Sequence, residues 1–155
     1  MFLVKDTIEQ RDELIKSLED LDTAVAVVIA AAHFEWTLRR CILALGTNPT
    51  KEIKDEEGAL YKCCGLDGYK DAWKEEVKNQ TGENLAEVVS SWEEVRKAFE
   101  LRNRLVHGSG GSTGKEYGRD RIDVLLKSAR ELTDYAEKHG KKIYGNNIVR
   151  KEKRE

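Results

Sequence analysis

A short segment near the middle of the chain combines a guanidinium, an amide and an imidazole. The segment reads Leu101-Arg102-Asn103-Arg104-Leu105-Val106-His107-Gly108. Histidine changes its charge near neutral pH, which suits proton transfer. Arginine keeps its charge and presents its donors in a planar fork. We therefore expect any chemistry that this protein performs to lie at Arg102, Asn103 and His107.

Arg102 occupies a helix position where an aliphatic residue is expected. The apolar residues around it recur at a spacing of three or four, the pattern of one helix face. They are Val88, Trp92, Val95, Phe99 and Val106. Burying a guanidinium without an anionic partner is costly. Two interpretations stay open at this point. Either Arg102 pairs with a buried carboxylate and His107 only ends the helix, or both residues take part in chemistry.

Asn103 and His107 extend into a row of polar residues along the same helix. They are four residues apart and therefore share one side of the helix. The same side continues back through Glu100 and Arg96. The row is a candidate surface for an anionic substrate, whereas Arg102 leans toward the packed side.

An earlier apolar helix carries charged residues that could belong to the same site. Glu35 interrupts this helix and is a candidate partner for Arg102. Arg39 and Arg40 follow on its last turns, where they are either a plain pair of terminal charges or part of an anion site. His33, among aromatic and alanine residues, is expected to be a core residue rather than a ligand.

The 155 residues correspond to one domain, because a chain of this length buries a single core. Charged residues make up 36% of the sequence and Pro49 is its only proline, which favours a soluble, mostly helical protein. We expect one helical domain over residues 1–145 and a charged tail over 146–155. The net charge of -2 provides no global field for a nucleic acid, so a local cluster must hold any anionic substrate.

Cysteine usage indicates a cytoplasmic protein without a metal site. Cys63 and Cys64 are adjacent, which is not a zinc spacing, and the three cysteines make no disulfide framework. The N-terminus lacks the apolar core of a cleavable leader. The longest apolar run, 24–32, is far shorter than the roughly 20 residues that cross a bilayer. We expect reduced thiols, no cofactor, no metal and no membrane segment.

The pattern of apolar residues and glycines predicts an all-α bundle of about four to six helices. Residues 5–45 contain neither glycine nor proline, so they form one very long helix or two collinear helices that meet near 20–23. The apolar stretch 24–32 is expected at the centre of the bundle. The other elements expected are helices at about 51–64, 68–79, 85–106 and 120–139, an interruption at 65–68 and a glycine-rich loop at 108–118.

At the Arg102 segment the sequence resembles the HEPN superfamily, the higher eukaryotes and prokaryotes nucleotide-binding domains. Members carry an arginine, four to six intervening residues and a histidine, commonly with a polar residue directly after the arginine. Arg102, Asn103 and His107 match that pattern. Members have a long alanine-rich early helix, whose acidic residue would correspond to Glu35, and a further helix after the motif. The resemblance implies an HEPN-like helical domain.

Many HEPN proteins are metal-independent endoribonucleases, often toxins or defence effectors, in which two motifs of a homodimer face one cleft. The resemblance therefore implies RNA as substrate and a second copy of the chain as partner. In cleavage by attack of the 2′-hydroxyl, His107 would act as acid or base and Arg102 would stabilise charge on the phosphorane. Asn103 would orient the imidazole or bind a phosphate oxygen.

Contacts to the RNA backbone would come from further arginines, namely Arg104, Arg96, Arg39 and Arg40. The near-neutral net charge argues against tight, extended RNA binding. Other HEPN domains are non-catalytic, so the alternative is an RNA-binding, nucleotide-binding or regulatory module that partners a nucleotidyltransferase or an antitoxin. A third interpretation is a helical regulatory protein that only dimerises. The arginine–histidine pair favours the nuclease, because a scaffold has no use for the charge at position 102.

Overall fold

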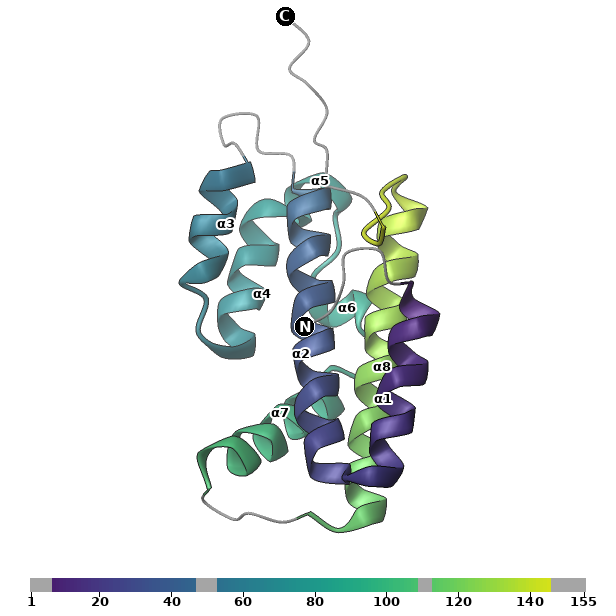
Figure 1. The fold of residues 1–155 in the computed structure, drawn as a ribbon. Helices are drawn as coiled ribbons and strands as arrows, with labels where there is room; N and C mark the ends of the chain where they lie inside the picture. The colour runs from purple at the N-terminus through teal and green to yellow at the C-terminus, as the bar shows by residue number, and fades with distance from the viewer. Residues whose placement is uncertain (1–6, 47–52, 109–112, 146–155) are drawn as a thin grey trace, which may run out of the picture.

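Helices are the only regular secondary structure in the part of the chain that the computed structural model describes, residues 7–46, 53–108 and 113–145 (Figure 1). The predicted all-α bundle is confirmed. Its helices are α1 (Ile8–Leu21), α2 (Thr23–Leu45), α3 (Ile53–Tyr61), α4 (Gly65–Glu76), α5 (Lys78–Thr81), α6 (Leu85–Val88), α7 (Trp92–His107) and α8 (Lys115–Lys138). Because α5 and α6 have only 4 residues each, the main helices of the described part fall within the predicted number.

The central element of the bundle is α2, which packs against α1, α3, α4, α7 and α8 (Figure 1). Ala26, Ala30 and Ala31 of α2 are fully buried, and such small side chains let neighbouring helices approach closely. The central position predicted for the apolar stretch is therefore confirmed. Two of its residues, Val25 and Ala32, are nevertheless exposed, so the stretch is not buried on every side.

The N-terminal helices α1 and α2 meet at Asp22, within the predicted junction 20–23. They form an antiparallel hairpin, so the prediction of a continuous or collinear path is wrong. Asp22 has an extended backbone, and its side chain accepts a hydrogen bond from the Val25 amide at 3.1 Å. This carboxylate caps α2 and interrupts the helical path without any glycine or proline. The guanidinium carbon of Arg11 consequently lies 3.7 Å from the centre of the Trp36 ring. In a continuous helix these residues would be about 38 Å apart.

The segment that carries Arg102 consists of two helices rather than the single helix predicted over 85–106. The path breaks between α6 and α7, where the Ser90 amide and hydroxyl both donate to the Glu131 carboxylate of α8. At its other end α7 terminates as predicted, because Gly108 adopts a left-handed conformation with φ 71°. The apolar stripe is shorter than predicted, since Val106 is exposed.

Two glycine-containing segments are more helical than the sequence indicates. Residues 65–68, predicted as an interruption, form the first turn of α4. The helix predicted from about 120 begins at Lys115 and includes Gly118. A Cβ on Gly118 would lie 2.4 Å from Cγ2 of Thr23, so this glycine lets α8 approach the start of α2. Residues 109–112 of the predicted loop and the predicted tail 146–155 lie outside the described residues.

His33 is a core residue, as predicted. Its side chain is fully buried in α2, and burial lowers its pKa to about 4, with the positive charges of Arg11 and Arg130 acting in the same direction. Nε2 of His33 lies 3.8 Å from an Asp12 oxygen, but burial also raises the pKa of Asp12. His33 is therefore neutral near pH 7 and packs inside the bundle.

None of the helices in the described part of the chain is long and apolar enough to cross a membrane. Cys41 is buried and its thiol donates to the Leu132 carbonyl at 3.3 Å, which ties α2 to α8. Cys41, Cys63 and Cys64 are all free thiols. Their roles in the described structure are those of packing and surface residues.

Candidate functional site

An aromatic pair fixes the position of α7 against α2. The rings of Phe34 and Phe99 meet edge to face, with their centres 5.8 Å apart. Glu35 directly follows Phe34 in α2, and Arg102 lies one helical turn after Phe99 in α7. The packing of two apolar side chains thus brings an acidic and a basic side chain into reach of each other.

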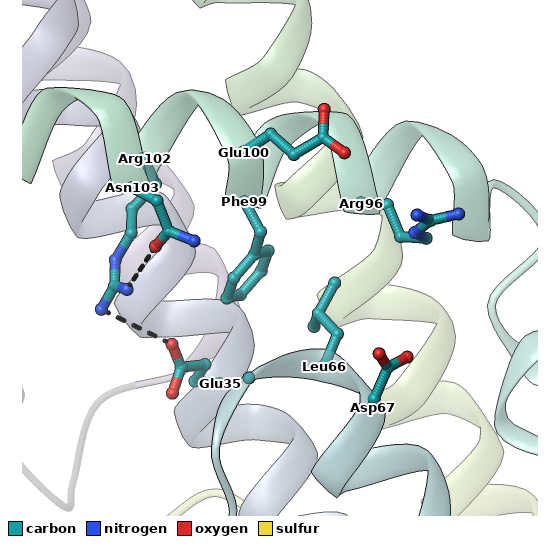
Figure 2. A pocket seen from close by; sticks show the side chains of 9 residues that line it. Glu35, Leu66, Asp67, Arg96, Phe99, Glu100, Arg102 and Asn103 are labelled. Carbon is teal, nitrogen blue, oxygen red and sulfur yellow. Dashed lines mark hydrogen bonds and ion pairs between the residues drawn. The ribbon is translucent and has the colours of Figure 1, made fainter. Parts of the chain in front are cut away.

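Arg102 pairs with Glu35, the partner that the sequence suggests (Figure 2). Nη2 of Arg102 lies 3.8 Å from Oε1 of Glu35, and Nη1 donates to Oδ1 of Asn103 at 2.9 Å. The two charged side chains remain 33% and 26% exposed. Ion pairs that keep contact with water are worth only about 0–1 kcal/mol. The Arg102 guanidinium is therefore oriented by its neighbours and still open to exchange partners with a ligand.

A cleft of about 370 Å³ lies next to this pair, between α7, α2 and the first turn of α4 (Figure 2). Leu66 and Phe99 contribute apolar side chains to it, and Arg96 lies farther along α7 on the side of Asp67. The lining residues are Glu35, Gly65, Leu66, Asp67, Arg96, Phe99, Glu100, Arg102 and Asn103. This lining includes two arginines and three carboxylates, so the cleft suits a ligand with one anionic group better than a long polyanion.

The wall contributed by α4 is absent from the sequence-based prediction. Leu66 and Asp67 line the cleft, and the buried Tyr69 lies one turn farther into the bundle. The hydroxyl of Tyr69 donates to Oε2 of Glu35 at 3.1 Å and accepts from Nε of Arg39 at 2.6 Å. No sequence signal singles out these residues, because they are separated from the Arg102 segment by more than thirty positions.

His107 lies beyond the cleft, on the exposed last turn of α7. It follows Asn103 by four residues, which places it on the same side of the helix about 6 Å farther along the axis. Arg102 points from α7 in a direction about 140° away from His107. Arg104 is exposed near the same end. The structure thus unites Arg102 and Asn103 at the cleft and leaves His107 as a neighbour along the helix.

The remaining predicted RNA-binding arginines have different surroundings. Arg96 lines the cleft, is half exposed and pairs with Glu93 at 3.0 Å. Arg39 is bound to Tyr69 and does not line the cleft. Nε of Arg40 donates to the Ile143 carbonyl, and the guanidinium carbon of Arg40 lies 4.9 Å from the Trp36 ring centre.

Arg39 and Arg40 thus each have a partner within the protein, and neither lines the cleft, while their contact with RNA stays a prediction. Burial lowers the pKa of Arg40, in keeping with its position against the segment that follows α8. Arg39 is held through its hydrogen bond to a buried phenol. Of the predicted RNA-binding arginines, Arg96 lines the cleft beside Arg102, and Arg104 is exposed near the end of α7.

Comparisons of the chain with known protein families, with curated proteins and with solved structures find no match. Within the residues described, no three His, Cys, Asp or Glu side chains are grouped so that they could hold a metal ion. The features of the molecule that bear on its function are the cleft and the side chains of α7 that lie in or near it.

Proposed function

We propose that this protein is a metal-independent endoribonuclease of the HEPN type that acts as a homodimer, in a toxin or defence role. The observation that carries the proposal is the placement of Arg102 on a part-open cleft, with Asn103 beside it and an exposed His107 one turn farther along the same helix. An oriented guanidinium and an accessible imidazole are the groups that phosphodiester transfer needs.

In the proposed reaction the 2′-hydroxyl oxygen of one nucleotide attacks the adjacent phosphorus. An imidazole of His107 accepts the 2′-hydroxyl proton, and the bond from phosphorus to the 5′-oxygen breaks. A proton passes to the departing 5′-oxygen, so the products are a 2′,3′-cyclic phosphate and a free 5′-hydroxyl. Arg102 stabilises the charge that builds on the phosphorane oxygens. Asn103 holds the Arg102 guanidinium in the orientation that this contact requires.

A second copy of the chain completes the site in this proposal. One chain offers one exposed histidine at the end of α7, whereas the reaction needs both a proton acceptor and a proton donor. The same end of the bundle, where α1 and α7 end and α8 begins, exposes the apolar residues Leu21, Val106 and Tyr117 (Figure 1). Exposed apolar side chains at this end of the bundle fit a contact with another copy.

Light scattering at micromolar concentration is expected to give about 35 kDa, twice the 17.7 kDa chain mass. Val106→Asp introduces a charge into the expected contact and should shift the protein toward the monomer and reduce RNA cleavage. Tyr61→Asp is the matched control, because Tyr61 is exposed on α3, away from this end. A monomeric wild-type protein that cleaves RNA would contradict the composite site.

An RNA-binding or nucleotide-binding module without catalysis is the second candidate, with a nucleotidyltransferase or an antitoxin as its partner. The three carboxylates in the cleft lining favour it, because they limit how many phosphates the cleft can hold. In this case the Arg102 guanidinium would bind a single phosphate and His107 would contribute only to recognition. RNA binding without cleavage distinguishes this candidate from the nuclease.

One gel tests the reaction that we propose. A labelled RNA, the DNA of the same sequence and an RNA with a single 2′-deoxy substitution at the cleaved position are incubated with the protein, each with and without excess EDTA. Cleavage is expected only in the unmodified RNA and is expected to be equal with and without EDTA. The deoxy substrates resist cleavage because they lack the attacking oxygen.

The ends of the products provide a further check. They are expected to carry a 2′,3′-cyclic phosphate, which shifts their mobility after treatment with acid and phosphatase. Cleavage of the DNA, or activity that EDTA removes and magnesium restores, would contradict the mechanism centred on His107. If no RNA is cleaved, the binding module becomes the better account.

A further inference from the structure

Two hydrogen bonds, from Arg39 to Tyr69 and from Tyr69 to Glu35, and an ion pair between Glu35 and Arg102 link α2, α4 and α7. We propose that Tyr69 is a positioning residue that keeps the Glu35 carboxylate available to Arg102 by holding Arg39 away from it. The inference rests on the proposed function of this site, in which Arg102 contacts the phosphate. Its geometric part can be tested without any activity.

Each oxygen of the Glu35 carboxylate has its own partner. Oε2 accepts a hydrogen bond from the Tyr69 hydroxyl at 3.1 Å, and Oε1 faces Nη2 of Arg102 at 3.8 Å. The Tyr69 hydroxyl in turn accepts from Nε of Arg39 at 2.6 Å. The phenol oxygen thus lies between an arginine and a carboxylate that belong to the same helix.

Without the Tyr69 hydroxyl, we expect Glu35 and Arg39 to form a direct ion pair. The two residues are four positions apart in α2, and an acidic residue followed by a basic residue at this spacing forms a favourable helical pair. Among the described residues, however, Glu35 forms its ion pair with Arg102 and not with Arg39. The phenol satisfies Arg39 and Glu35 separately, so the carboxylate keeps one oxygen for Arg102.

Tyr69 is suited to this separation because its position and its proton are both fixed. Its side chain is buried within the core, so the hydroxyl has little freedom to move. Burial raises the pKa of Tyr69 to about 12, and the Glu35 charge adds to the effect. The hydroxyl therefore remains protonated at neutral pH, donates its proton to Glu35 and keeps a lone pair for Arg39.

Tyr69→Phe is expected to lower kcat for RNA cleavage about tenfold and to leave KM within about twofold. The ring is retained, but Arg39 becomes able to pair with Glu35, so Arg102 loses the neighbour that orients it. Tyr69→Phe/Arg39→Met is expected to recover most of the lost kcat, because no competing arginine remains. Tyr135→Phe is the matched control, since it removes another largely buried phenol hydroxyl away from the cleft.

The Nε–H signal of Arg102 in a ¹H–¹⁵N NMR spectrum reports the same rearrangement independently of catalysis. We expect this signal to shift in Tyr69→Phe, to return toward its wild-type position in Tyr69→Phe/Arg39→Met and to stay unchanged in Tyr135→Phe. If the wild-type protein cleaves no RNA, the proposed function fails while these spectra still decide the positioning role.

Two results would overturn the inference. One is an Arg102 signal that does not move in Tyr69→Phe, and the other is a double variant as impaired as the single variant, which would assign Tyr69 to packing alone. Thermal melting checks that Tyr69→Phe folds. If Tyr69→Phe does not fold, Glu35→Gln serves instead. The Arg102 signal should shift in Glu35→Gln, because the carboxylate partner of Arg102 is lost. Adding Arg39→Met should not restore the signal, because the glutamine amide attracts Arg39 only weakly. Restoration by Arg39→Met would contradict the inference.

Discussion

Replacement of His107 by alanine is expected to slow RNA cleavage by about 100-fold to 10,000-fold, the usual contribution of a general acid or base. The fold should be unaffected, because the imidazole is exposed on the last turn of α7 and forms no hydrogen bond or ion pair within the part of the chain that is described. Gly108, which ends the helix through its left-handed conformation, remains in place. Initial rates on a labelled RNA measure the loss, and circular dichroism with thermal melting checks the fold.

His139→Ala is the matched control for this substitution. His139 is also exposed and also ends a helix, but it lies at the far end of α8, against the ring of Tyr135. This control should cleave RNA at the wild-type rate. If His107→Ala were equally active, His107 would be no more than a helix-terminal residue and the binding module would replace the nuclease.

Substitution of Arg102 by lysine is expected to reduce cleavage by about 100-fold or more, although the positive charge is retained. A lysine ammonium is a point charge that cannot make two parallel hydrogen bonds to phosphate oxygens, and it cannot keep the contacts with Asn103 and Glu35 together. RNA binding should change only a few-fold, because the charge stays. Rates under single-turnover conditions separate the chemical step from binding.

The stability of Arg102→Lys should stay close to that of the wild type. The ion pair with Glu35 is partly exposed, and such pairs contribute about 0–1 kcal/mol to the free energy of unfolding. Arg130→Lys is a suitable control: Arg130 is also a part-exposed arginine, and it pairs with Asp12 on α1, away from the cleft. Normal cleavage by Arg102→Lys would show that the motif arginine is structural.

Local interactions account for the features of this protein that its sequence predicts correctly. The spacing of apolar residues defines the buried face of a helix, so the pattern places Arg102 next to the core. The acidic Glu35 in the apolar helix is its candidate partner, and the two side chains form an ion pair. The end of α7 was predicted at Gly108, because a glycine accepts the left-handed conformation at little cost. The all-α class follows from the same local preferences.

The tertiary structure decided that the chain turns back at Asp22 and that a second break precedes α7. An aspartate can lie inside a helix or cap a new one, and Asp22 caps α2 because α1 gains apolar packing by folding back. The break before α7 depends on Glu131, whose carboxylate accepts a hydrogen bond from the Ser90 amide, 41 positions away in the sequence. The conformational preferences of a short sequence segment include neither the packing of α1 on α2 nor the hydrogen bond between Ser90 and Glu131.

The composition of the candidate site was likewise decided in three dimensions. An amphipathic pattern shows that α4 has a buried face, but it does not show that this face meets Glu35. The positions of Asp67 in the cleft and of Tyr69 against Glu35 could therefore not be predicted. Arg39 and Arg40 are adjacent in the sequence and diverge in space, because successive residues of a helix point about 100° apart. Periodicity specifies which face of each helix is buried, whereas the packing of side chains from distant segments selects the partner for that face.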